Sequence, residues 1–161
     1  MKFLLTAKSH PATLTSEKQI PIADCSKGGV SMAAFMTFFN TRAYALMRIV
    51  VGFLFLCHGA QKLFGFPMPM RGGTPAFITY IAGPIELVGG TLIMIGLFTR
   101  WSAFLCSGEM AVAYWLVHGT KALFPIQNGG ELAAFYCFVF LFISTQGGGI
   151  WSLDAIRKKS E

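Results

Sequence analysis

Four long apolar segments, separated by short connections rich in turn-forming residues, constrain the fold of this chain more than any other feature. Each is close to the roughly 20 residues that an α-helix needs to cross the hydrocarbon core of a bilayer. The connections "GFPMPMRGGTP", "TR" and "GTKALFPIQNGG" are short enough to join antiparallel neighbours. The pattern predicts an all-α protein, an integral membrane four-helix up-and-down bundle. Its predicted helices are Ala43 to Phe66, Ala76 to Phe98, Trp101 to His118 and Glu131 to Ile150.

Composition supports a membrane protein and argues against a nucleic-acid-binding one. Of the 161 residues, 54% are hydrophobic and only 12% are charged, whereas a soluble surface carries about 25–35% charged residues. The length fits one domain. The formal net charge is +6, but the Lys and Arg residues cluster in the tails and are not interleaved with aromatic residues. The basic charge therefore indicates a membrane surface as its partner.

The positions of the basic residues predict the orientation of the bundle. Lys and Arg are concentrated in the N-terminal tail, at Arg100 and in the C-terminal tail, against Arg71 and Lys121 in the other two connections. Because positively charged flanks stay in the cytoplasm, we expect both termini there. Residues 155–161 then form a basic cytoplasmic tail, after a membrane domain that spans residues 43–154.

The first 40 residues differ in character from the rest. They contain "FLL" after Lys2 but no apolar core of the length that a signal peptide requires, so we expect a disordered cytoplasmic tail over residues 1–40. The codons for "KGG" at Lys27 to Gly29 are purine-rich, like a bacterial ribosome-binding site, and lie just before Met32. Our hypothesis is that translation starts at Met32 or Met36, and an intact mass beginning at Met1 would contradict it.

The second apolar segment carries Pro84 and Glu86 near its middle. A carboxylate at that depth is costly, so Glu86 should face the interior and be paired or protonated. Pro84 removes one helical hydrogen bond and leaves the Tyr80 carbonyl without its usual donor. We expect a cation or donor of the first helix to hold Glu86, with Arg48, Lys62 and His58 as the alternatives.

The other polar residues of the apolar segments extend this site. At about 100° of rotation per residue, the three polar residues of the first helix fall on one side of it. The third helix adds Glu109, and "NGGE" opens the fourth. The candidate intramembrane polar network is Arg48, His58, Lys62, Glu86, Glu109, Asn128 and Glu131. Its carboxylates outnumber its permanent cations, which predicts a group that accepts protons.

Small residues and cysteines have simpler interpretations. Glycine allows helices to approach closely, and the residues expected to serve helix packing are Gly52, Gly59, Pro84, Gly89 and Gly90. The four cysteines form no CxxC and no metal-like spacing, so we expect no metal site. Cys57 and Cys137 fall at similar depth, and the sequence leaves open whether they form a disulfide or only pack.

Four stretches carry a resemblance to a known family. "RIVVGFLFLCHGAQKLFG", "AGPIELVGGTLIMIGLFTR", "PIQNGGELAAFYCFVFLF" and "GGGIWSLD" resemble the DoxX family of small four-helix proteins of the bacterial inner membrane. The resemblance covers about Arg48 to Asp154 and implies a multi-pass protein of the cell inner membrane. The matching positions are Arg48, Gly52, His58, Gly59, Lys62, Pro84, Glu86, Gly89, Gly90, Gly96, Arg100, Asn128, Gly129, Glu131 and Asp154.

The resemblance implies the fold more firmly than the chemistry. Family members are associated with quinol oxidase and thiosulfate:quinone oxidoreductase, which favours a redox-associated, quinone-interacting membrane subunit with a partner redox subunit or a homo-oligomeric assembly. In that hypothesis His58 and Glu131 bind the quinone carbonyls and Glu86 exchanges protons. The alternative is a small-solute carrier or a membrane scaffold or assembly protein without catalysis of its own. Heme is the weakest option, because His118 lies at the very end of its helix.

Overall fold

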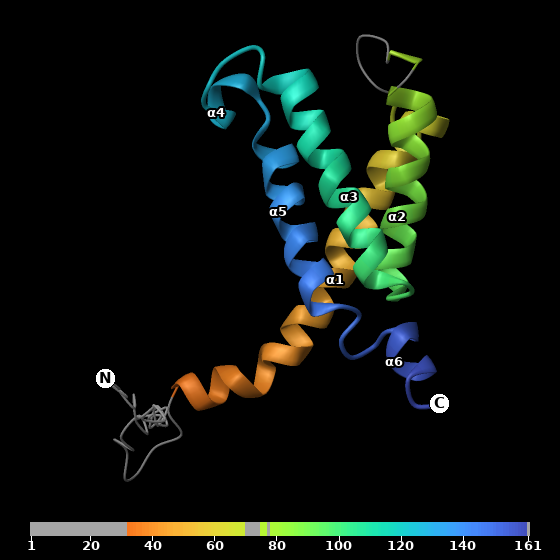
Figure 1. Cartoon of the computed structure of the whole chain (residues 1–161), viewed down its shortest axis with the longest axis vertical. Coiled ribbons are helices and arrows are strands. Elements are labelled where there is room, and N and C mark those ends of the chain that lie inside the picture. The colour runs from red at the N-terminus through yellow and green to blue at the C-terminus, as the bar shows by residue number, and fades with distance from the viewer. Residues whose placement is uncertain (1–31, 70–74, 77, 161) are drawn as a thin grey trace, which may run out of the picture. The chain divides into compact units, whose positions relative to one another are not determined.

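The computed structural model describes residues 32–69, 75–76 and 78–160, and the chain within these ranges is helical without any strand. Most of the predicted tail, residues 1–31, lies outside the described residues. The structure does not test the hypothesis of an internal translation start. The elements drawn in Figure 1 are α1 (Met32–Phe64), η1 (Ile78–Ala82), α2 (Gly83–Ile95), α3 (Thr99–Ala113), η2 (Tyr114–His118), α4 (Pro125–Asn128), α5 (Glu131–Gln146) and α6 (Leu153–Arg157).

The predicted membrane segments are all helical, but their boundaries differ from the prediction. Helix α1 begins at Met32, so the part of the predicted disordered tail that the structure describes before residue 41 is helical. The stretch "MAAFMTFFN" contains no Gly or Pro, and a helix propagates easily through such a sequence once it has formed. Helix α2 ends earlier than predicted because Gly96 adopts the left-handed conformation, with a φ of 72°.

Within the described residues, two stretches are long and apolar enough to cross a membrane, Phe39–Phe64 and Ile78–Ile95. Helix α5 is also apolar but has 16 residues. The described part of the chain is therefore all-helical with two membrane-capable helices. The four-span bundle and the cytoplasmic position of both termini stay predictions.

Helix α1 packs closely against α2 because glycines lie at their contact. A Cβ added at Gly52 would lie 2.6 Å from the backbone nitrogen of Met94, and one at Gly90 would lie 2.8 Å from the carbonyl of Gly52. At Gly59 a Cβ would lie 2.8 Å from the Gly83 carbonyl. Real Cβ atoms do not approach backbone so closely, so only glycine permits this helix separation. Gly89 faces the other way, against Cys106 of α3.

Arg48 fixes the end of α2. Its side chain is fully buried, and Nη1 donates to the carbonyls of Ile93 (2.5 Å) and Met94 (2.8 Å) while Nη2 donates to the carbonyl of Trp151 (2.8 Å). Carbonyls at a helix C-terminus lack helical partners and carry partial negative charge. A Cβ at Gly96 would lie 3.0 Å from Arg48 Nη1, so this glycine leaves room for the guanidinium.

Two more charged side chains bind helix ends at the same end of the molecule, beside α6 (Figure 1). Arg100, at the start of α3, donates to carbonyls of the last turn of α5 at 2.5 to 3.3 Å. Asp154 of α6 accepts from the backbone N–H groups of Phe98 (2.9 Å) and Thr99 (3.0 Å), and from the Thr99 hydroxyl. Cations thus lie at helix C-termini and an anion at a helix N-terminus, as the helix dipoles favour.

Candidate functional site

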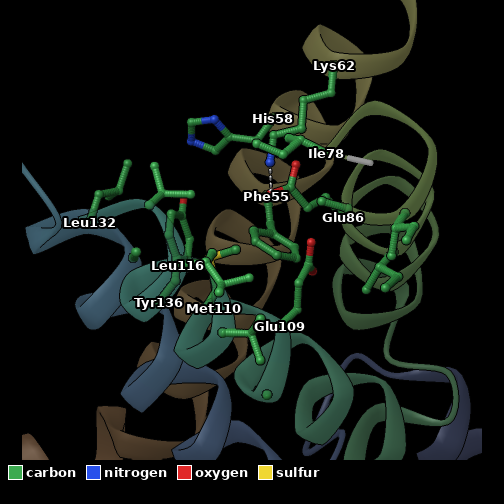
Figure 2. Close-up of a pocket in the computed structure, with 18 of the residues that line it drawn as sticks. Phe55, His58, Lys62, Ile78, Glu86, Glu109, Met110, Leu116, Leu132 and Tyr136 are labelled. Carbon is green, nitrogen blue, oxygen red and sulfur yellow. Dashed lines mark hydrogen bonds and ion pairs between the residues drawn. The ribbon is translucent and has the colours of Figure 1, made fainter. Parts of the chain in front are cut away.

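A cavity of about 920 Å³ lies among α1, α2, α3, α5 and the two π-helical turns η1 and η2. Most of its wall is apolar, with side chains such as Phe55, Met110 and Leu132. Figure 2 shows polar groups that converge on it from α1, α2, α3 and α5. The titratable side chains that line it are His58, Lys62, Glu86, Glu109, His118 and Tyr136.

Both π-helical turns border this cavity. Turn η1 directly precedes α2, whose second residue, Pro84, has no N–H to give to the Tyr80 carbonyl. The helix widens at that point, and Ile78, Ile81 and Ala82 of η1 become part of the cavity wall. On the opposite side η2 contributes Leu116, Val117 and His118. Such turns occur often at functional sites, because they displace side chains from the regular helical register.

The cavity contains a buried ion pair between α1 and α2. Lys62 Nζ donates to Glu86 Oε1, and Glu86 is only 2% exposed. Lys62 is therefore the partner among the three alternatives that the sequence left open. The pair sits where Gly59 and Gly83 bring the two helices together, one turn from each of its members. Glu86 Oε2 is buried and has no hydrogen-bond partner among the described residues.

Glu109 of α3 lies on the same cavity without a partner. Both of its carboxyl oxygens are buried, and neither forms a hydrogen bond with any described residue. Figure 2 shows its side chain directed into the cavity toward Glu86, and the two groups are near enough for their charges to interact. Unsatisfied buried carboxyl oxygens are rare and require an explanation.

An aromatic group forms the wall opposite the ion pair. The His58 ring lies edge-on to Tyr136, with centroids 6.0 Å apart, and Tyr136 stacks on Phe140 at 5.5 Å. Phe55 contacts both Tyr136 and Phe140. Sequence reasoning missed Tyr136, because it falls within the aromatic run "FYCFVF" and carries no charge. Its spacing of four residues from Phe140, which places both on one helix face, was the available signal.

Three residues of the predicted network do not line the cavity. Arg48 is occupied by the end of α2 instead of Glu86. The Asn128 amide donates to the Tyr114 hydroxyl (3.2 Å) and the Ala122 carbonyl (3.0 Å), and its oxygen accepts from Gly130 N–H, so it orders the connection before α5. Glu131 is exposed at the first position of α5, where its charge favours the helix N-terminus.

The cysteines and histidines of the described chain form no metal or disulfide site. Cys57, Cys106 and Cys137 are free thiols, and Cys137 lies 3.7 Å from the Ser107 hydroxyl. No group of three or more His, Cys, Asp and Glu residues within the described ranges could hold a metal ion. His118 Nδ1 lies 2.9 Å from the Asn128 carbonyl, which ties this ring to the connection before α5.

Comparison with known proteins identifies the family. The model of the DoxX family matches residues 43–119, which include Lys62, Glu86 and Glu109. An uncharacterized protein of Haemophilus influenzae is 45% identical over 116 residues, which cover 68% of this chain and 87% of that protein. The chain belongs to the DoxX family. The resemblance seen in the sequence is thereby confirmed.

Two other relatives of this DoxX protein have more informative names. "Putative oxidoreductase CatD" of Bacillus subtilis is 37% identical over 113 residues, covering 68% of this chain and 82% of that protein. "Uncharacterized membrane protein Rv3486" of Mycobacterium tuberculosis is 29% identical over 126 residues, covering 67% of this chain and 77% of that protein. No solved structure gives a significant match. Family and relatives together indicate a membrane protein.

Proposed function

We propose that this DoxX protein is a redox-associated subunit of the bacterial inner membrane that binds a quinone headgroup in the cavity between its helices. In this proposal it spans the membrane four times as an up-and-down bundle with both termini in the cytoplasm. The observation that carries the proposal is the cavity itself, which combines an apolar wall with several convergent proton-exchanging groups. Sites for small organic ligands have this character.

The cavity wall offers a route for a lipid-soluble ligand. Several of its apolar side chains, among them Ile81 of η1 and Leu105 and Val112 of α3, are also exposed on the outside of the protein. In a bilayer these side chains would face the acyl chains. A quinone dissolved in the membrane could then enter between α2 and α3 without passing through water.

The polar groups suit the chemistry of a quinone. Reduction of a quinone to a quinol takes up two electrons and two protons, so the site must supply protons and hydrogen bonds to two carbonyl oxygens. His58 and Lys62 carry N–H donors, and Glu86 and Glu109 carry carboxyl groups, all on the cavity wall. Glu131, which the sequence suggested for one carbonyl, is exposed and outside the cavity. A partner redox protein would supply the electrons.

The relatives' names support the two halves of the proposal separately. One relative is named as a putative oxidoreductase and another as a membrane protein. The second candidate function is that of a small-solute carrier or a scaffold without catalysis. The observation that favours it is the Lys62–Glu86 ion pair, which joins α1 to α2 and could serve only to hold these two helices together.

The test is binding of a short-tailed quinone to the purified protein in lipid nanodiscs. A Cβ added at Gly108 meets nothing within 4 Å, and this residue lines the cavity. Gly108→Leu should therefore obstruct the cavity without disturbing the fold, and we expect at least a tenfold loss of quinone affinity.

The matched control is Leu54→Phe, which adds apolar volume at an exposed position of α1 outside the cavity. We expect its quinone affinity to equal that of the unmodified chain. Quinone binding that is absent, or that survives Gly108→Leu unchanged, would contradict the proposal and leave the carrier or scaffold as the better hypothesis. Mass spectrometry of lipids that copurify with the protein gives an independent check.

A further inference from the structure

We infer that Glu109 carries a proton at neutral pH and presents its hydroxyl to the cavity as a hydrogen-bond donor for a ligand with a carbonyl oxygen. Within the proposed function, Glu109 then takes the place of Glu86 as the proton donor of the site. The inference rests on the proposed function only in naming a quinone as that ligand. The protonation of Glu109 follows from the hydrogen-bond geometry and the charges around it, whatever the ligand is.

The hydrogen-bond geometry of the two carboxyl groups, Glu86 and Glu109, supports this inference. Lys62 satisfies Glu86 Oε1, while Glu86 Oε2 and both oxygens of Glu109 have no partner among the described residues. Glu86 is 98% buried, as its 2% exposure shows, and it lines the cavity. Buried polar atoms that the protein leaves unsatisfied destabilise the folded state. Their common direction into one cavity (Figure 2) indicates that a ligand satisfies them.

The balance of charge around Glu109 also favours a proton on its carboxyl group. Besides Glu109, titratable groups line the cavity from four elements, and Cys106 lies near Glu109 on α3. The lining groups are Lys62 and His58 from α1, Glu86 from α2, His118 from η2 and Tyr136 from α5. Among these, Lys62 is the permanent cation, and Glu86 already engages it. A second carboxylate would have no cation of its own.

Two effects then oppose the ionised form of Glu109. Burial in an apolar cavity removes the water that stabilises a carboxylate, and the neighbouring negative charge of Glu86 repels a second one. In other proteins, paired carboxyl groups in such surroundings share a single proton. Here the ion pair decides which group keeps it, because Lys62 stabilises the charge on Glu86. Glu109 is therefore the protonated member.

A protonated carboxyl has one O–H group, and the described residues offer Glu109 no acceptor. A carbonyl oxygen of the ligand would fill that role. During reduction the Glu109 O–H bond breaks and a quinone O–H bond forms, while the two electrons come from the partner redox protein and the second proton comes from water. The carboxylate left on Glu109 has no cation of its own, because Glu86 engages Lys62, and this favours the return of a proton to Glu109.

Infrared difference spectroscopy on the full chain in lipid vesicles tests the inference. At neutral pH the spectrum should contain the C=O stretch of a buried protonated carboxyl, which Glu109→Gln removes. Lys62→Met should increase this band, to about twice its intensity, because Glu86 loses its cation and becomes protonated as well. Glu86→Gln should weaken it, because Glu109 can then ionise beside Lys62. Glu131→Gln is the matched control and should leave the band unchanged, since Glu131 is exposed.

The possible outcomes separate this inference from the quinone proposal. A missing band, or a band that persists in Glu109→Gln, would overturn the protonation of Glu109. If Glu109→Gln does not fold, the Lys62→Met spectrum replaces it, and a C=O band that does not grow there would also overturn the protonation of Glu109. A short-tailed quinone should shift the band to lower frequency in the unmodified chain. If quinone binds but the C=O band does not shift, Glu109 is not the hydrogen-bond donor to the quinone. If no quinone binds, the proposed function is wrong, and the spectra of the variants still decide whether Glu109 is protonated.

Discussion

At the scale of single residues, the cavity derives its chemistry from an imbalance between one lysine and two glutamates. Lys62 and Glu86 neutralise each other, and Glu109 has no counterpart. The sequence indicated this imbalance because all three lie in apolar segments, where isolated charges are costly. The sequence could not identify which cation pairs with Glu86. Arg48 and Lys62 are both on the polar side of α1, and only their depth relative to Glu86 distinguishes them.

Removal of Lys62 gives the first prediction. Losing one partner of a buried ion pair costs roughly 3–5 kcal/mol when the other charge remains, and proton uptake by Glu86 would reduce that cost. We expect Lys62→Met to lower the midpoint of thermal unfolding in detergent and the double variant Lys62→Met, Glu86→Gln to recover most of the loss. Lys121→Met, at an exposed position, is the control. Equal midpoints for all four proteins would show that the pair contributes nothing to stability.

At the scale of helices, glycine and helix-end contacts determine how the elements meet. The sequence predicted that Gly52, Gly59 and Gly90 would serve packing, and the structure places them where α1 contacts α2. It did not predict the role of Arg48 or Arg100, because a contact with backbone carbonyls leaves no complementary side chain to recognise. Three of the positions that carry the family resemblance, Arg48, Arg100 and Asp154, therefore fix helix ends and do not line the cavity.

The glycine contact gives the second prediction. In Gly59→Ala the new Cβ would meet the backbone of Leu87 and lie 2.8 Å from the Gly83 carbonyl, so α1 and α2 must separate. We expect a clear loss of thermal stability. Gly108→Ala is the matched control, because a Cβ there meets nothing within 4 Å and alanine favours a helix by about 1 kcal/mol over glycine. Similar effects of the two substitutions on unfolding temperature would contradict the packing argument.

The Asp154 contact gives the third prediction, which concerns pH. Partial burial raises the pKa of Asp154, but hydrogen bonds from Thr99 and Phe98 and the charge of Arg157 outweigh it and hold the pKa below its usual value. The folded state therefore gains stability from this group above the unfolded pKa of about 3.9. That stability is lost as the pH falls through the lower, folded pKa.

Unfolding temperatures measured between pH 7 and pH 3 would test this. The unfolding temperature of the unmodified chain should fall below about pH 4 by an amount that is missing in Asp154→Asn. The Asp154→Asn variant should already be less stable than the unmodified chain at pH 7. Glu131→Gln, which changes an exposed carboxylate at another helix start, is the control. Identical pH profiles for the unmodified chain and Asp154→Asn would show that the contact with α3 does not contribute.

At the scale of the whole molecule, sequence predicted the helical segments well but not the cavity between them. Apolar runs and glycines reveal where helices form and where they touch. The cavity depends on where helices do not touch, and this is set by the two π-helical turns and by the side chains of α5, such as Tyr136. Pro84 gave a local sign of the first turn. Nothing in "YWLVH" indicated the second, because no proline or glycine interrupts it.

Orientation gives the last prediction. The distribution of Lys and Arg predicts that the connection containing Lys121 faces the periplasm and that α6 and the C-terminal tail face the cytoplasm. The His58 and Lys62 end of the cavity would then lie toward the periplasm, and the helix-end contacts of Arg48, Arg100 and Asp154 toward the cytoplasm. In a chain whose native cysteines are replaced by alanine, Lys121→Cys should react with a membrane-impermeant thiol reagent in intact cells. Lys158→Cys should react only after the membrane is opened, and the reverse pattern would invert the molecule and place the cavity on the cytoplasmic side.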